Sequence, residues 1–148
     1  MIDLTELLEE WKNDCQISEM HLDESSRQVP ILHSKYLEKL MSVKLLLKRA
    51  EFTQKTLLKQ KWLYYNGKMD QDDIEKLGWK ADPFDGLKIL KGEMNYYYDA
   101  DPEIQKSEEK IEYYKNTVSV LTEIVDTIKW RHKTIGNIII WKVFESGG

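Results

Sequence analysis

The stretch PEIQKSEEKIEYYKNTVSVLTEIVDTIKWRHKTIGNII, residues 102–139, decides the fold. Nine apolar side chains and His132 recur there at alternating three- and four-residue steps after a first step of seven, at Ile104, Ile111, Tyr114, Val118, Leu121, Val125, Ile128, His132, Ile135 and Ile139. Asp101 and Pro102 are a capping carboxylate and a first-turn proline, and they predict the start of the helix. Gly136 costs about 1 kcal/mol against alanine, so the helix is expected to bend there or to continue. The spacing predicts a coiled-coil-like seam.

A second long helix is expected upstream. Pro30 sits where a proline is tolerated, in the first helical turn, and neither glycine nor proline recurs before Gly67. These signals predict one helix of about 35 residues, closed by Asn66 and Gly67. Its apolar residues form one narrow seam, made of Val29, Leu32, Tyr36, Val43, Leu47, Ala50 and Leu57.

Shorter elements surround these two helices. Residues 3–14 predict a short helix capped by Asp3, which the polar stretch DESSRQ ends. The glycines and prolines of residues 69–101 indicate a connector, with a helical turn or two around DDIEKLG and irregular chain through WKADPFDG. The expected fold class is therefore all-α, a long helical hairpin within one domain. Its segments are an acidic N-terminal helix (1–28), a basic helix (29–68), the connector (69–101) and an oligomerisation helix (102–148).

The composition favours apolar seams buried between chains over a large core within one chain. Hydrophobic residues make up 41% of the sequence and charged residues 32%. The apolar cluster at 138–141 lies nearly all round its helix and is expected to need a partner chain. The one cysteine, Cys15, excludes an internal disulfide. No signal peptide is present, and no apolar run reaches the roughly 20 residues that span a bilayer, so a soluble intracellular protein is expected.

No pattern for catalysis or metal binding is present in the sequence. The three histidines lie in separate segments, and none has metal-ligand spacing with another histidine or with a cysteine. His132 at a seam position favours a polar residue that sets register over a ligand. The acidic run DQDD at 70–73 favours a solvated helix start over a metal site. There is no glycine-rich phosphate loop and no nucleophile elbow, so neither an enzyme nor a cofactor is expected.

Positive charge is concentrated in one segment of a chain whose net charge is −4. Residues 29–68 hold nine basic and two acidic side chains and end in LLKQKWLYYNGK, residues 57–68. On a helix, Lys44, Lys48, Lys55 and Lys59 fall within an arc of about 60° that also contains Trp62. Lys61 lies on the seam side, close to Tyr65. Basic charge beside aromatic rings is typical of single-strand binding, although a solvated helix face and tyrosines packed in a core remain alternatives.

The stretch LLKQKWLYYNGK resembles the basic motif of the UvsY family, the recombination mediators of T4-like phages. In that motif a lysine and an arginine two apart precede paired tyrosines and a glycine-basic step. The matching residues are Lys59, Lys61, Tyr64, Tyr65, Gly67 and Lys68. Lys61 stands where the family has arginine, which keeps the charge but loses the bidentate fork. The connector also looks longer than the family pattern.

The C-terminal stretch IKWRHKTIGNIIIWKVFESGG resembles a second motif of the same family. Its matching residues are Ile128, Lys129, Arg131, Ile135, Phe144, Glu145 and Gly147. The two motifs occur in the order that the family has, and the stretch YLEKLMSVKLLLKRAE leads into the first. The resemblance therefore covers most of the chain.

The resemblance implies a non-enzymatic, phage-encoded protein of the host bacterial cytoplasm that acts in DNA recombination, repair and replication. It would bind single-stranded DNA as a hexameric or heptameric ring and help a RecA-like recombinase replace the single-strand-binding protein. The expected DNA-binding residues are Lys55, Lys59, Lys61, Trp62, Tyr64, Tyr65 and Lys68. The expected oligomerisation residues are Leu121, Val125, Ile128, His132, Ile135, Ile139 and Phe144. The rival hypothesis is a helical scaffold or assembly chaperone that contacts only proteins, through the acidic segments 1–28 and 69–112.

Overall fold

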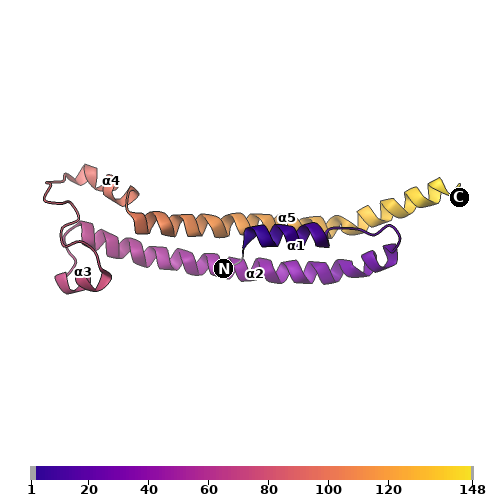
Figure 1. Ribbon diagram of the computed structural model, residues 1–148, viewed down its shortest axis with the longest axis horizontal. Coiled ribbons are helices and arrows are strands. Elements are labelled where there is room, and N and C mark those ends of the chain that lie inside the picture. The colour runs from indigo at the N-terminus through magenta and orange to yellow at the C-terminus, as the bar shows by residue number, and fades with distance from the viewer. Residues whose placement is uncertain (1–2, 148) are drawn as a thin grey trace. The chain divides into compact units, whose positions relative to one another are not determined.

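The computed structural model describes residues 3–147, so residues 1, 2 and 148, at the ends of the first and last expected segments, lie outside the described residues. Every regular element within 3–147 is a helix, which confirms the all-α prediction (Figure 1). The elements are α1 (Leu4–Asp14), α2 (Leu22–Tyr65), α3 (Gln71–Leu77), the 3₁₀ helix η1 (Lys91–Glu93), α4 (Met94–Asp99) and α5 (Pro102–Glu145). The two long helices have 44 residues each. None of the described helices is long and apolar enough to cross a membrane.

Two compact units make up the chain, and both long helices contribute to each. Among the described residues, unit 1 contains 3–46 and 114–147, and unit 2 contains 47–113. In each unit a length of α2 lies beside a length of α5, and the two run in opposite directions. The helical hairpin expected from the sequence is therefore present.

The core of unit 1 forms where α1 packs against the two long helices. Tyr36, Val43, Leu121 and Ile128 are fully buried, and Leu7 of α1 is 2% exposed. Each buried Leu, Ile or Val contributes about 1.5–3 kcal/mol by leaving water. The rings of Trp11 and Tyr36 meet edge to face, with centroids 5.3 Å apart. These apolar contacts fix α1 on the hairpin.

Polar contacts hold the two ends of α1. The Asp3 carboxylate accepts from the backbone N–H of Thr5 at 2.8 Å, which confirms the predicted cap. At the other end, Asp14 accepts from Lys35 Nζ at 2.6 Å and from the Tyr36 hydroxyl at 2.7 Å. Burial raises the pKa of Asp14, but the hydrogen bonds from Lys35 and Tyr36 outweigh it, and the net pKa is lowered. The carboxylate is therefore charged at neutral pH.

The start of α2 differs from the prediction. The helix begins at Leu22 and contains Pro30 in its interior, whereas the sequence placed Pro30 in the first turn. The DESSRQ stretch is helical because Asp23 lies in the first turn, where the helix dipole favours acids, and Arg27 pairs with it at 3.0 Å. Pro30 removes the helical bond to the carbonyl of Ser26. Ser26 is exposed, so water can hydrate that carbonyl and the helix continues.

The end of α2 and the path of α5 agree with the sequence signals. Gly67 has a φ of 68°, and Lys68 N donates to the carbonyl of Leu63 at 2.8 Å, a glycine-terminated helix end. The Asp101 carboxylate caps α5 at the backbone N–H of Glu103 and Ile104, at 2.9 and 3.1 Å. Helix α5 continues through Gly136 without ending.

Most of the predicted seam of α5 is buried, and residues that the sequence did not predict join it. Tyr114, Leu121, Val125, Ile128 and Ile135 are buried as expected, and Thr117, Ile124 and Arg131 are buried as well. Val118 is half-buried. His132 is exposed in the single chain, so its predicted place in a seam between copies stays a prediction. The apolar pattern passed over Thr117 and Arg131 because both are polar.

Candidate nucleic-acid interface

The exposed side of α2 in unit 2 carries lysines and aromatic rings in alternation. We call Lys48, Phe52, Lys55, Lys59 and Trp62 the basic–aromatic face. They recur at steps of four and three residues and therefore share an arc of about 80° on a regular helix. All five are exposed. The face lies opposite the side on which α2 packs, so it is open along its length.

Little negative charge lies on this face. Glu51 is its one acidic neighbour on α2, at 3.8 Å from Lys48 Nζ. Within residues 3–147 no ion pair forms to Lys55, Lys59 or the exposed Lys68. The lysines instead contact rings. Lys48 and Lys55 Nζ lie 5.2 and 5.7 Å from the Phe52 ring centroid, and Lys68 Nζ lies 4.6 Å from that of Trp62.

Lys61 lies on the buried side of the same helix. It is 4% exposed, and its Nζ is 3.0 Å from Asp101 Oδ2 and 3.5 Å from Glu103 Oε1. The ammonium also lies 3.8 Å from the centroid of the Trp79 ring. Two carboxylates and an aromatic face replace the water that a lysine loses on burial. Contact between Lys61 and a phosphate therefore stays a prediction, and it requires this ion pair to open.

Tyr64 and Tyr65 are also interior residues, which agrees with the core alternative that the sequence left open. Tyr64 is 6% exposed and Tyr65 is 9% exposed. The Tyr64 hydroxyl donates to the carbonyl of Lys80 at 2.7 Å, and the Tyr65 hydroxyl donates to Asp101 at 2.6 Å. Burial, and then the bond to Asp101, raises the pKa of Tyr65. Stacking of a base on either ring likewise stays a prediction.

The connector folds around these two tyrosines. Ile74 of α3 completes their buried cluster, and partly buried side chains pack against it, namely Met69, Trp79, Phe84, Met94, Tyr97 and Tyr98. The predicted helical turns at DDIEKLG are present as α3. Helix α4 is an element that the sequence did not predict. It forms where the rings of Tyr97 and Tyr98 pack on Tyr65 at centroid distances of 6.4 and 5.2 Å.

The structure thus divides the seven expected DNA-binding residues into two groups. Lys55, Lys59, Trp62 and Lys68 are exposed, and they lie on or beside the basic–aromatic face. Lys61, Tyr64 and Tyr65 are buried on the other side of the same helix. Phe52 joins the exposed group, although the sequence did not single it out. A signal was present, because Phe52 falls in the same arc as Lys48, Lys55 and Lys59.

The sequence of this chain matches a known protein family. The family model described as "Recombination, repair and ssDNA binding protein UvsY" matches residues 10–148. The chain belongs to the UvsY family. It is 29% identical over 144 residues to the recombination protein uvsY of Enterobacteria phage T4, and the match covers 97% of this chain and 98% of the relative.

Crystal structures of the bacteriophage T4 recombination mediator protein UvsY have a similar fold. One of them, lattice type II, has a TM-score of 0.80 at 28% identity and covers 99% of each chain. Another, lattice type IV, has a TM-score of 0.79 at 27% identity, covering 97% of this chain and 99% of the other. The family resemblance inferred from the two sequence motifs is therefore confirmed.

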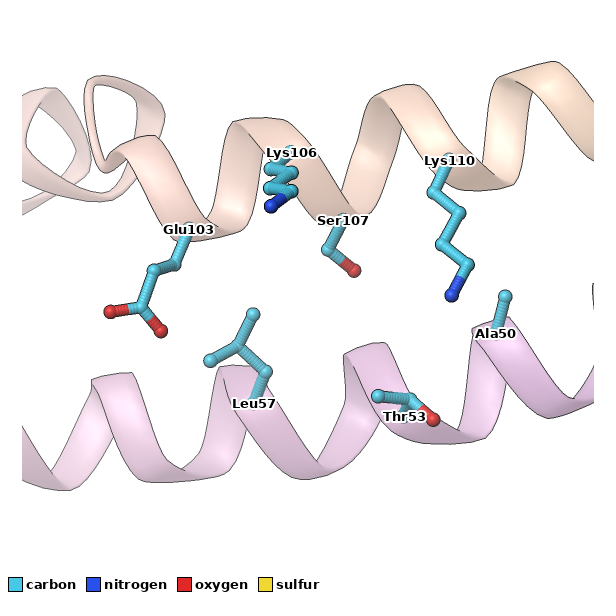
Figure 2. Close-up of a pocket in the computed structure, with 7 residues that line it drawn as sticks. All are labelled: Ala50, Thr53, Leu57, Glu103, Lys106, Ser107 and Lys110. Atoms are coloured by element: carbon cyan, nitrogen blue, oxygen red, sulfur yellow. The ribbon is translucent and has the colours of Figure 1, made fainter. Parts of the chain in front are cut away.

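On the packed side of α2 in this UvsY-family chain, a groove of about 320 Å³ runs between α2 and α5 in unit 2. Figure 2 shows its lining side chains projecting toward one another from the two helices. Ala50, Thr53 and Leu57 come from α2, and Glu103, Lys106, Ser107 and Lys110 come from α5. The small side chains Ala50 and Ser107 leave the space open. The groove has an apolar floor and lysines at its rim.

The residues expected to mediate assembly also divide into buried and exposed ones. Leu121, Val125, Ile128 and Ile135 belong to the core of unit 1. His132 is exposed, Ile139 is 46% exposed and Phe144 is 73% exposed. The last two lie in an apolar C-terminal segment with Ile140, Trp141 and Val143, which are more than half exposed. In this UvsY-family chain an assembly role for these residues stays a prediction.

Proposed function

We propose that this protein is a recombination mediator that binds single-stranded DNA and promotes loading of a RecA-like recombinase onto strands covered by single-strand-binding protein. The observation that carries the proposal is the open basic–aromatic face on a chain of the UvsY family. Lys55, Lys59 and Lys68 are placed to neutralise phosphates, and Trp62 offers a flat surface for a base. Neither kind of contact depends on base sequence, as a mediator requires.

Several copies of the face on one strand would supply most of the affinity. We propose that the exposed apolar C-terminal segment assembles the protein into a ring-like homo-oligomer. A strand held by one subunit then meets the next subunit at high effective concentration, so contacts that are weak alone act together. Such a ring would hold the strand in a shape that favours the recombinase over the single-strand-binding protein. The protein would work through binding energy and not through catalysis.

The defining experiment measures recombinase filament formation on a strand already coated with single-strand-binding protein. The wild type should shorten the delay before filaments appear, and the Lys55→Ala/Lys59→Ala variant should lose most of this effect. Lys115→Ala is the control, since Lys115 is an exposed lysine of another helix, α5, and belongs to unit 1. Retention of the wild type on a single-stranded DNA column, and elution by salt, reports the binding step separately. A wild type that neither binds the column nor aids loading would favour a scaffold acting through protein contacts only.

A further inference from the structure

We propose that Phe52 is a stacking platform for one base of a bound single strand, with Lys48 and Lys55 contacting the phosphates on either side of that base. The inference rests on the proposed function and names a binding residue for it. Its basis is the geometry of one helical face: an exposed ring with a lysine one turn before it and another one turn after it.

The Phe52 ring lacks the cover that aromatic side chains usually have. Phe52 is 55% exposed, whereas Ala50, two residues earlier on the packed side of α2, is 8% exposed. A phenylalanine is a large apolar surface, and leaving it in water is unfavourable. Among residues 3–147 only lysine ammonium groups contact the ring in a defined geometry. The ring is therefore available to a ligand with a flat apolar surface.

The charges around Phe52 indicate which ligand would cover it. Lys48 and Lys55 flank the ring, and Lys59 continues the charge along the same arc. A second copy presenting this same face would place lysine against lysine, which is repulsive. A nucleic-acid strand instead brings a flat base and negative phosphates together. Its two parts match the ring and the flanking ammonium groups.

A base that stacks on the ring would displace the two lysines, and the lysines could then bind the phosphates of the same strand. An ammonium over an exposed aromatic ring is a weaker contact than a base stacked on such a ring. Lys48 is exposed, with 60% of its side chain accessible, so it is free to move from the ring to a phosphate. The lysines then gain a charge-assisted contact while the base takes the ring face.

The same pairing of ring and lysine occurs at the end of α2. Lys68 lies over Trp62, which is 47% exposed. Phe52 and Trp62 are ten residues apart, which corresponds to about 15 Å along the helix axis. Unit 2 thus carries two exposed ring-and-lysine pairs whose rings both belong to α2, and the Phe52 pair extends the interface toward the middle of α2.

The test compares an oligothymidylate with an abasic strand of the same length, which retains the phosphates and lacks the bases. Phe52→Ala should lower affinity for oligothymidylate by about five- to 150-fold, the usual effect of losing one stacked base. It should leave affinity for the abasic strand and the salt dependence unchanged. Phe52→Trp should bind as tightly as the wild type. Lys48→Ala/Lys55→Ala should lower the salt slope on both strands by about 0.7 for each phosphate that the variant no longer neutralises.

Leu45→Ala is the matched control, because Leu45 is 71% exposed, lies one heptad before Phe52 and has no ring. It should bind both strands as the wild type does. Equal losses on both strands for Phe52→Ala, or full binding by Phe52→Leu, would overturn the stacking role. A smaller oligomer for Phe52→Ala in sedimentation would instead place Phe52 in a contact between copies. If Phe52→Ala shows no selective loss on oligothymidylate while Lys55→Ala/Lys59→Ala still binds and loads poorly, the stacking role is wrong and the proposed function stands. If neither variant shows its expected loss, the proposed function is wrong as well.

Discussion

The side-chain ammonium of Lys61 lies 3.0 Å from a carboxylate oxygen of Asp101, and neither side chain is more than 5% exposed. The same carboxyl group accepts the hydroxyl of Tyr65 and caps the first turn of α5. One side chain therefore joins the end of α2 to the start of α5. Breaking it should affect the whole of unit 2.

Lys61→Ala should strongly destabilise the protein. Removing one partner of a buried ion pair leaves the other charge without compensation, at a cost of about 3–5 kcal/mol. Lys61→Met/Asp101→Asn removes both charges and should recover much of the loss. Denaturant unfolding followed by circular dichroism measures both variants. A Lys61→Ala variant as stable as the wild type would contradict the importance of the pair.

Lys61 should also differ from Lys59 in its effect on DNA binding. Lys59→Ala should lower the slope of log affinity against log salt by about 0.7 for each phosphate left without its lysine, on strands of any sequence. The fold should be unchanged, because Lys59 is exposed. Lys61→Met, measured under conditions in which the variant is folded, should keep the wild-type slope of log affinity against log salt. A slope lowered by Lys61→Met would mean that the ion pair opens and the ammonium reaches a phosphate.

The stability of unit 2 should fall in acid. Burial raises the pKa of Asp101, but hydrogen bonds from Tyr65 and Lys61 outweigh it, so its net pKa lies below the ordinary value of 3.8. A carboxyl group whose pKa is lowered by folding stabilises the protein above its unfolded pKa, and this contribution is lost as the pH falls through the folded pKa. The melting temperature should therefore drop below about pH 4. Asp101→Asn should melt lower at pH 7 and show a weaker drop.

Assembly should depend on the exposed C-terminal side chains. Ile140→Ser/Phe144→Ser replaces two residues that lie outside the core of unit 1, so the fold should be retained. Sedimentation should show smaller species than the wild type, and affinity for a long strand should fall because fewer linked subunits engage it. Glu123→Gln, at an exposed position of α5 outside the expected assembly residues, is the control. Unchanged sedimentation of the double variant would place assembly elsewhere.

Local chemistry made much of the fold predictable. Asp3, Asp101 and Gly67 act within one helical turn, so their capping roles can be inferred from neighbouring letters alone. The seam of α2 was predictable because its members are apolar and regularly spaced. Thr117 and Arg131 were missed in the seam of α5 because a polar residue usually lies on the protein surface. Arg131 is buried because it donates to the carbonyls of Cys15 and Gln16, at 3.0 and 2.8 Å, more than a hundred positions away.

The charge of the candidate site was predictable from the sequence, whereas the buried partners of its residues were less so. The arc of lysines followed from helical geometry, and so did the placement of Lys61 on the opposite side. Its partner Asp101 comes from a distant segment, and no local pattern joins the two. Helix α4 was missed for a similar reason, since a segment of six residues is too short to be stable alone and depends on packing against Tyr65.

The shared carboxyl group of Asp101 also restricts how this sequence can evolve. A change at position 101 alone removes an ion-pair partner, a tyrosine acceptor and a helix cap in one step. Viable descendants should therefore keep the aspartate and vary its cation, which permits arginine in place of Lys61. Loss of the aspartate should occur only together with loss of the charge at position 61. Positions 61 and 101 should consequently change together in diverging lineages, whereas Lys55 and Lys59, which have no such ion-pair partner among the described residues, should show no coupling of this kind.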